Sequence, residues 1–89
     1  MAKTIWKYPI LVQDYFEIAM PIGAQILTVQ MQNGVPCIWV VVKSGIDVAS
    51  ENRRFTVHGT GHPVGENEKY IGTFQMANGA LVFHTFEVT

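Results

Sequence analysis

Two Asn-Gly dipeptides, Asn33-Gly34 and Asn78-Gly79, constrain the fold of this chain more than any other feature. Each stands between two runs that are rich in apolar residues. Asparagine and glycine readily adopt the positive φ angles of a type I′ turn, whose twist matches that of paired antiparallel strands. The sequence therefore predicts two β-hairpins, one within 26–43 and one within 70–88.

A two-residue loop fixes which residues of a hairpin face each other. In each hairpin, the resulting register makes one face apolar and leaves the other face mixed in polarity. The pairs expected in the first hairpin are Val29 with Ile38, Leu27 with Val40, and Thr28 with Trp39. The pairs expected in the second are Phe74 with Phe83, Met76 with Leu81, Thr73 with His84, Gln75 with Val82, and Ile71 with Phe86.

The remaining segments also have the composition of strands. Further strands are expected over 4–12, 15–19 and 53–58. In the last of these, Phe55 and Val57 should face the core, and Arg54, Thr56 and His58 should face away from it. Because no segment has the apolar spacing of an amphipathic helix, the patterns favour an all-β fold. We expect a compact antiparallel sandwich or a partly open barrel of six to seven short strands.

The chain is long enough for one domain only. With 89 residues, two separate cores would each bury too little surface to offset the entropy of the chain. We therefore expect a single domain over residues 1–89. Two connections, 44–52 and 59–69, are long enough to carry function.

Charge is scarce and balanced along the chain. Charged residues make up 15% of it, with six basic against seven acidic side chains. A protein that coats DNA needs a basic stripe, so bulk DNA binding is not expected. Hydrophobic residues make up 48% of the chain. So much apolar surface with so few charges predicts a homo-oligomer.

The cysteine content and the longest apolar run bear on localisation. Cys37 is the only cysteine, so no intramolecular disulfide can form, which fits a reducing compartment. The longest apolar run, 35–42, contains a proline and is too short to span a bilayer. We expect a cytosolic protein that makes no contact with a membrane.

The segment 59–62, Gly-Thr-Gly-His, is the most unusual local feature. Closely spaced glycines let backbone N–H groups approach a phosphate or carboxylate, and Arg53, Arg54 and His58 lie just upstream. One interpretation is an anion cradle, and the other is a wide turn that uses glycine for backbone freedom. The segment matches neither a P-loop nor a dinucleotide-binding fingerprint, so the pattern does not decide between them.

The three histidines, His58, His62 and His84, lack the spacing of metal ligands. No strand carries two of them two residues apart, and no cysteine or carboxylate stands at a familiar ligand spacing. We therefore expect no metal and no cofactor. His84 shares a strand face with Phe86, so it either points at a ligand or a partner subunit or is simply a half-exposed histidine.

Trp39 lies on the mixed face of the first hairpin. An aromatic ring there can stack on a nucleobase, form a second apolar layer, or contribute to a subunit interface. Catalysis is not expected, because there is no Gly-x-Ser-x-Gly motif and the carboxylates are scattered. The candidate ligand-binding residues are Trp39, Arg53, Arg54, His58, Gly59, Thr60, Gly61, His62, His84 and Phe86.

Short segments that follow one another along nearly the whole chain form a distinctive pattern. They are IWKYP at 5–9, MPIGAQIL at 20–27, VQMQNG at 29–34, PCIW at 36–39, RRF at 53–55, GTGH at 59–62, YIGTF at 70–74 and LVFH at 81–84. A chain with this pattern resembles a family of small phage and prophage proteins of unknown function. The resemblance implies a phage-encoded early or accessory protein in the cytoplasm of a bacterial host, and it brings no catalytic residues.

Two functions of different classes fit these residues. The first is a non-catalytic anti-defence inhibitor that sequesters a nucleotide immune signal in a pocket of a homo-oligomer. Guanidinium groups and backbone donors would meet the phosphates, and aromatic faces would meet the bases. The alternative is a protein-binding inhibitor of a host defence or nuclease complex, or a virion accessory protein, that docks through exposed strand edges.

Overall fold

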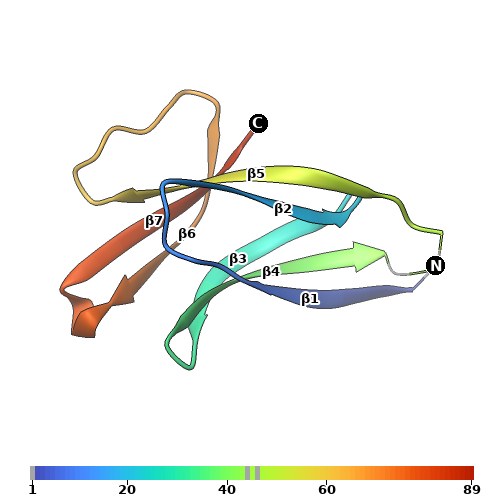
Figure 1. The fold of residues 1–89 in the computed structure, drawn as a ribbon, viewed down its shortest axis with the longest axis horizontal. Helices are drawn as coiled ribbons and strands as arrows, with labels where there is room; N and C mark the ends of the chain where they lie inside the picture. Colours follow the sequence, from blue (N-terminus) through green and yellow to red (C-terminus); the bar gives the residue numbers. More distant parts are fainter. Residues whose placement is uncertain (1, 44, 46) are drawn as a thin grey trace.

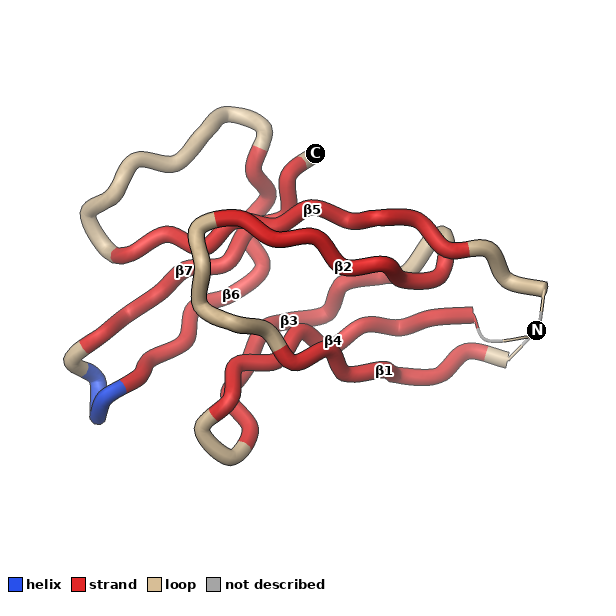
Figure 2. Tube along the Cα trace, in the orientation of Figure 1, coloured by secondary structure: helices blue, strands red, loops and turns tan. Residues whose placement is uncertain are grey.

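The computed structural model describes residues 2–43, 45 and 47–89. Strands make up most of this part of the chain, and one short 3-10 turn joins the last two of them (Figure 2). The elements are β1 (Lys3–Pro9), β2 (Tyr15–Pro21), β3 (Gln25–Gln32), β4 (Val35–Lys43), β5 (Ser50–Gly59), β6 (Glu68–Met76), η1 (Ala77–Gly79) and β7 (Leu81–Val88).

The strands form two antiparallel sheets that pack on each other as a sandwich (Figure 1). One sheet has the order β1-β4-β3, and the other has the order β2-β5-β7-β6. The all-β prediction is confirmed. Of the two architectures that we considered, the sandwich fits, because the sheets do not close into a barrel.

The core lies between the two sheets. Ile38, Val40 and Val42 of β4 are almost completely buried there. Phe55 and Val57 of β5 are also buried, as the alternation predicted, and the ring of Phe55 stacks on that of Phe16 with the centroids 5.4 Å apart. The side chains that alternate with these two, Arg54, Thr56 and His58, therefore point away from the core.

Both Asn-Gly dipeptides have the backbone conformation that a type I′ turn needs. The φ angles are 50° and 80° at Asn33 and Gly34, and 55° and 87° at Asn78 and Gly79. In the second hairpin Ala77 also has a positive φ of 53°, so the connection is the turn η1 rather than a bare two-residue loop.

The expected register holds near each turn and fails further along the strands. The pairs of Val29 with Ile38 and of Phe74 with Phe83 are present. Two expected pairs are wrong, because Ile26 rather than Leu27 stands opposite Val40, and Tyr70 rather than Ile71 stands opposite Phe86. The register shifts at Ile26/Thr28 and at Tyr70/Gly72. A β-bulge at each place adds one residue to one strand, which moves all later pairs by one position.

The boundaries of some segments also differ from those expected. The first strand ends at Pro9, which has no N–H for a further ladder bond, and does not continue to residue 12. Ser44, at the start of the expected 44–52 connection, lies outside the described residues, and β5 already begins at Ser50. Within the described residues, no helix is long and apolar enough to cross a membrane.

Candidate functional site

The face of the four-stranded sheet that points away from the core gathers most of the candidate residues, and we call it the outer face. Alternation along β5 places Arg54 and His58 there. Cross-strand pairing adds Phe86, opposite Thr56, and His84, opposite His58. The predicted outward direction of Arg54 and His58 is therefore what brings these candidates together.

Glu68 is the centre of one hydrogen-bonded cluster on the outer face. His58 Nε2 lies 2.7 Å from Glu68 Oε1, and Thr56 Oγ1 donates to the same oxygen. The backbone N–H of Gly65 donates to Glu68 Oε2. Burial acts to raise the pKa of Glu68, but the hydrogen bonds from Thr56, His58 and Gly65 outweigh it and lower the pKa below its usual value.

His84 is the centre of a second cluster. Its Nε2 lies 2.8 Å from Thr60 Oγ1, and its Nδ1 lies 2.9 Å from Thr73 Oγ1. The Thr73 hydroxyl is in turn 2.6 Å from the hydroxyl of Tyr70. Both ring nitrogens of His84 are therefore held by threonine hydroxyls, which fixes the orientation of the ring.

An aromatic row crosses the outer face and shares one residue with each cluster, Thr56 with the first and Tyr70 with the second. Tyr15 stands opposite Thr56, which stands opposite Phe86, and Phe86 stands opposite Tyr70. The ring of Phe86 makes edge contacts with those of His58 and Tyr70, both at centroid distances of 5.6 Å. Tyr15 is 47% exposed and Tyr70 is 56% exposed, so aromatic surface at both ends of the row faces solvent.

The Gly-Thr-Gly-His segment forms a hydrogen-bonded turn at the end of β5. The N–H of His62 donates to the carbonyl of Gly59 at 3.1 Å, and Gly61 has a φ of +92° that favours glycine. The N–H of Thr60 donates to the carbonyl of Val82. Because these donors already have acceptors within the protein, the segment offers fewer free N–H groups than a phosphate cradle needs.

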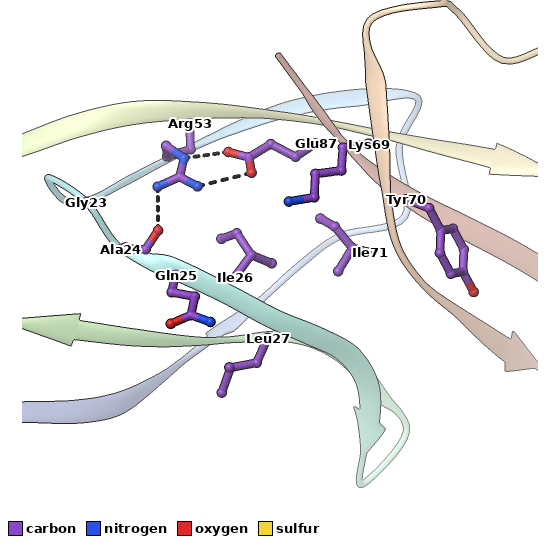
Figure 3. A pocket seen from close by; sticks show the side chains of 10 residues that line it. All are labelled: Gly23, Ala24, Gln25, Ile26, Leu27, Arg53, Lys69, Tyr70, Ile71 and Glu87. Carbon is purple, nitrogen blue, oxygen red and sulfur yellow. Dashed lines mark hydrogen bonds and ion pairs between the residues drawn. The ribbon is translucent and has the colours of Figure 1, made fainter.

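Arg53 lies on the opposite face of β5 from Arg54. Its Nε donates to Glu87 Oε2, its Nη2 lies 3.0 Å from Glu87 Oε1, and its Nη1 donates to the carbonyl of Ala24 at 2.8 Å. The pKa of Arg53 is raised, chiefly by the hydrogen bonds to Glu87. Arg53 therefore belongs to a separate groove of about 510 Å³ between β3 and β6 (Figure 3).

Trp39 is placed on the other sheet. It is half-buried and stands opposite Lys7 and Thr28 in the β1-β4-β3 sheet. The structure therefore brings Arg54, His58, Thr60, His84 and Phe86 to the outer face, with Gly59, Gly61 and His62 in the turn at its end. Arg53 and Trp39 are not brought there.

Several residues of the outer face were not among the candidates. The sequence presents Glu68 as one of several scattered carboxylates, and it assigns neither Tyr15 nor Thr73 to a site. The expected pairing of Thr73 with the candidate residue His84, which the structure contains, indicates that Thr73 lies beside the site. Nothing in the sequence signals Glu68, because its contacts depend on the path of the 60–67 connection.

The described residues contain no group of three or more His, Cys, Asp or Glu side chains that could hold a metal ion. A family model described as a domain of unknown function, DUF7352, matches residues 1–89. The chain belongs to this family. Neither the comparison with curated proteins nor the comparison with solved structures finds a match. The family carries no activity with it, so the function has to be argued from the outer face itself.

Proposed function

We propose that the protein is a non-catalytic nucleotide-binding protein whose outer face holds the ligand. The observation that carries this proposal is the aromatic row of Tyr15, Phe86 and Tyr70 on an exposed sheet face. Stacking of a base on an aromatic side chain contributes roughly 1–3 kcal/mol, and exposed sheet faces with aromatic rings are a recurrent way to bind bases.

Arg54 supplies the positive charge next to the aromatic row. It is two residues from Thr56 along β5, roughly 7 Å away at the rise of a strand. Arg54 is exposed and forms no ion pair with the residues that the structure describes. Arg54 stands opposite Glu17 of β2. A base on Phe86 would place its phosphate near this guanidinium, which no carboxylate of the described residues binds within 4 Å.

The biological setting in the proposal comes from the resemblance to small phage proteins. In an infected bacterium, a small nucleotide binder without catalytic groups acts by removing a nucleotide immune signal of the host. The proposal also includes a homo-oligomer, because the chain combines exposed apolar side chains with few charges. The exposed apolar side chains of Ile5, Trp6 and Leu11 in and beside β1 supply a surface for this association.

Isothermal titration calorimetry against cyclic dinucleotides, cyclic trinucleotides and ADP-ribose derivatives tests the proposal. We expect binding to at least one of them, weakened about fivefold to tenfold by Arg54→Ala and by Tyr70→Ala. Lys43→Ala, an exposed lysine at the end of β4 on the other sheet, is the matched control. Absence of heat with every ligand at high micromolar concentration would sink the proposal.

A second candidate function is supported by the same apolar surface. An edge strand with exposed Ile5 and Trp6 is also suited to dock a host protein by strand addition. A pull-down and the calorimetry together distinguish the two functions. A host protein recovered in stoichiometric amount with the wild type but not with Ile5→Lys, together with no heat of nucleotide binding, would favour this second function.

A further inference from the structure

The groove between β3 and β6 lies beside the outer face and shares Tyr70 with it. These two strands are edge strands of different sheets. They are in close contact at Val29 and Gly72, where a Cβ added to Gly72 would stand 2.9 Å from Val29 Cγ1. Beside this contact lies the groove of about 510 Å³ (Figure 3).

The walls of the groove are strand edges rather than strand faces. Consecutive residues line each wall, 23–27 on one side and 69–71 on the other, whereas a strand face would contribute alternate residues. In the described part of the chain, no backbone hydrogen bond joins β3 to β6. The N–H group of Gly23 and the N–H and C=O groups of Ala24 are bonded within the protein. The backbone groups of 25–27 and 69–71 that β4 and β7 leave unpaired are therefore the ones available to an occupant.

Both β-bulges of the sandwich occur at this groove. The register shift in β3 falls at Leu27, and the shift in β6 falls at Ile71, and both residues line the groove. Bulges are frequent next to binding sites, because they redirect side chains and interrupt pairing. Both bulges therefore contribute a residue to the lining of the groove.

The wall formed by the start of β3 is held in place before any ligand binds. Arg53 donates to the carbonyl of Ala24 at 2.8 Å, and the N–H of Gly23 donates to Glu51 Oε2 at 3.0 Å. A wall that is already ordered loses little entropy when a ligand binds.

Lys69 is the group of the groove that can recognise an acidic occupant. Arg53 is bound through two nitrogens by Glu87, and its Nη1 lies 3.8 Å from Glu51 Oε2. Lys69 stands opposite Glu87 and is directed into the groove, and it forms no ion pair with the described residues (Figure 3). Its ammonium group can therefore pair with a carboxylate of a ligand.

We propose that this groove binds an extended peptide segment that pairs with the free strand edges and places an acidic side chain at Lys69. The volume is within the range of roughly 300–1,000 Å³ that is typical of small-ligand sites, so it suits a short segment rather than a folded domain. Main-chain hydrogen bonds supply the affinity for the peptide, and the pairing of its carboxylate with Lys69 supplies the preference for an acidic sequence. This site shares Tyr70 with the proposed nucleotide face, but neither Lys69 nor the edge of β3 belongs to that face.

Fluorescence anisotropy with two labelled peptides tests the inference. Both peptides alternate threonine and valine; one has a central glutamate and the other a central lysine. We expect the wild-type protein to prefer the glutamate peptide about fivefold to tenfold, and Lys69→Glu to reverse the preference. Lys43→Glu changes the net charge equally but lies outside this groove, and should leave the preference unchanged.

Hydrogen exchange locates the bound peptide. We expect slower exchange of amides within 25–27 and 69–71, which line the groove, and no change in Lys3–Pro9, the other free edge of the β3 sheet. Equal binding of the two peptides, an unchanged preference in Lys69→Glu, or protection confined to β1 would each overturn the inference. Neither Lys69→Glu nor Lys43→Glu changes Arg54 or the aromatic row. Nucleotide binding by the same variants can therefore be measured by calorimetry as a separate result.

Discussion

Arg53 and Arg54 are neighbours in the sequence, yet they have opposite environments. The alternation along β5 predicts that they point to opposite sides of the sheet, and the structure places them so. What the alternation does not predict is the partner of Arg53. Glu87 is 34 positions further along the chain, and only the packing of β5 against β7 brings it to the guanidinium. Local patterns therefore give the direction of a side chain but not what it meets.

Glu68 shows the same gap between local pattern and tertiary contact, and it leads to a pH prediction. Its pKa is lower in the folded protein than in the unfolded chain, so the unfolded chain takes up the proton first as the pH falls. The stabilising contribution of Glu68 is therefore present above the ordinary carboxylate pKa. We expect it to be lost as the pH falls through the lowered value, from about pH 5 downward.

Urea unfolding of wild type and Glu68→Gln at a series of pH values measures this effect. We expect Glu68→Gln to lower the free energy of unfolding by about 1–2 kcal/mol at pH 7, and the difference to shrink toward pH 3. Glu66→Gln, at an exposed position of the same connection, is the control and should stay close to the wild type. A constant difference across the whole pH range would contradict the role of the Glu68 charge.

At the scale of elements, turn chemistry was predictable, and of the bulges at Leu27 and Ile71 only the second had a local signal in the sequence. The Asn-Gly dipeptides identify the turns because few other residues accept the positive φ that the turns need. Leu27 has no glycine or proline beside it to announce a bulge, whereas Gly72 follows Ile71 directly, and a glycine inside a strand often marks a bulge. The extra residue is accommodated where β3 and β6 face each other, and that is a tertiary arrangement that no local pattern contains.

The contact between β3 and β6 predicts the effect of a methyl group at Gly72. A Cβ there would lie 2.9 Å from Val29 Cγ1 and 3.4 Å from the backbone N and O of Val29. Val29 is buried and its backbone cannot easily move, so we expect Gly72→Ala to lower the free energy of unfolding by about 1–3 kcal/mol. Chemical denaturation followed by tryptophan fluorescence measures the change.

Two comparisons separate this clash from the general cost of replacing a glycine. In Gly45→Ala the new Cβ would stand 3.7 Å from Val48 Cγ2, an ordinary contact, and we expect a change within about 0.5 kcal/mol. In a Val29→Ala background, Gly72→Ala should cost less than in the wild type, because the nearest clashing atom is gone. If the loss of stability in the double variant equals the sum of the losses in the two single variants, the contact between the new Cβ and Val29 does not cause the destabilisation.

At the scale of the whole molecule, the class of fold was predictable and the order of strands was not. Alternation and turn signals indicate strands and adjacent hairpins. The pairing of β1 with β4 and of β2 with β5 joins segments that are far apart in the sequence. These pairings depend on which apolar faces bury each other best in three dimensions, and no single segment carries that information.

The proposed oligomer makes a prediction at this scale. The free edge of β1 exposes Ile5 at 59% and Trp6 at 41%, and Leu11 just after it is 77% exposed. We expect the wild-type protein to self-associate in light scattering coupled to size exclusion, and Ile5→Lys to shift it toward the monomer, because a charge at a free edge opposes edge-to-edge pairing.

Leu81→Lys provides the matched control for the oligomer. Leu81 is 50% exposed at the start of β7 and does not belong to β1. We therefore expect Leu81→Lys to leave the mass of the assembly in solution unchanged. A wild-type protein that stays monomeric at every concentration, or a loss of association that is equal in both variants, would argue against an interface at β1.

The strand order also has a consequence for how the chain is made. Lys3 pairs with Lys43, and Tyr15 pairs with Thr56, so each of the first two strands waits for a partner roughly forty residues away. At about 5–20 residues per second, translation leaves those strands unpaired for roughly 2–8 s. During that time the exposed isoleucine and tryptophan of β1 are open to chaperones and to neighbouring nascent chains. The yield of correctly folded protein in a cell should therefore depend on what meets β1 on the ribosome before β4 has emerged.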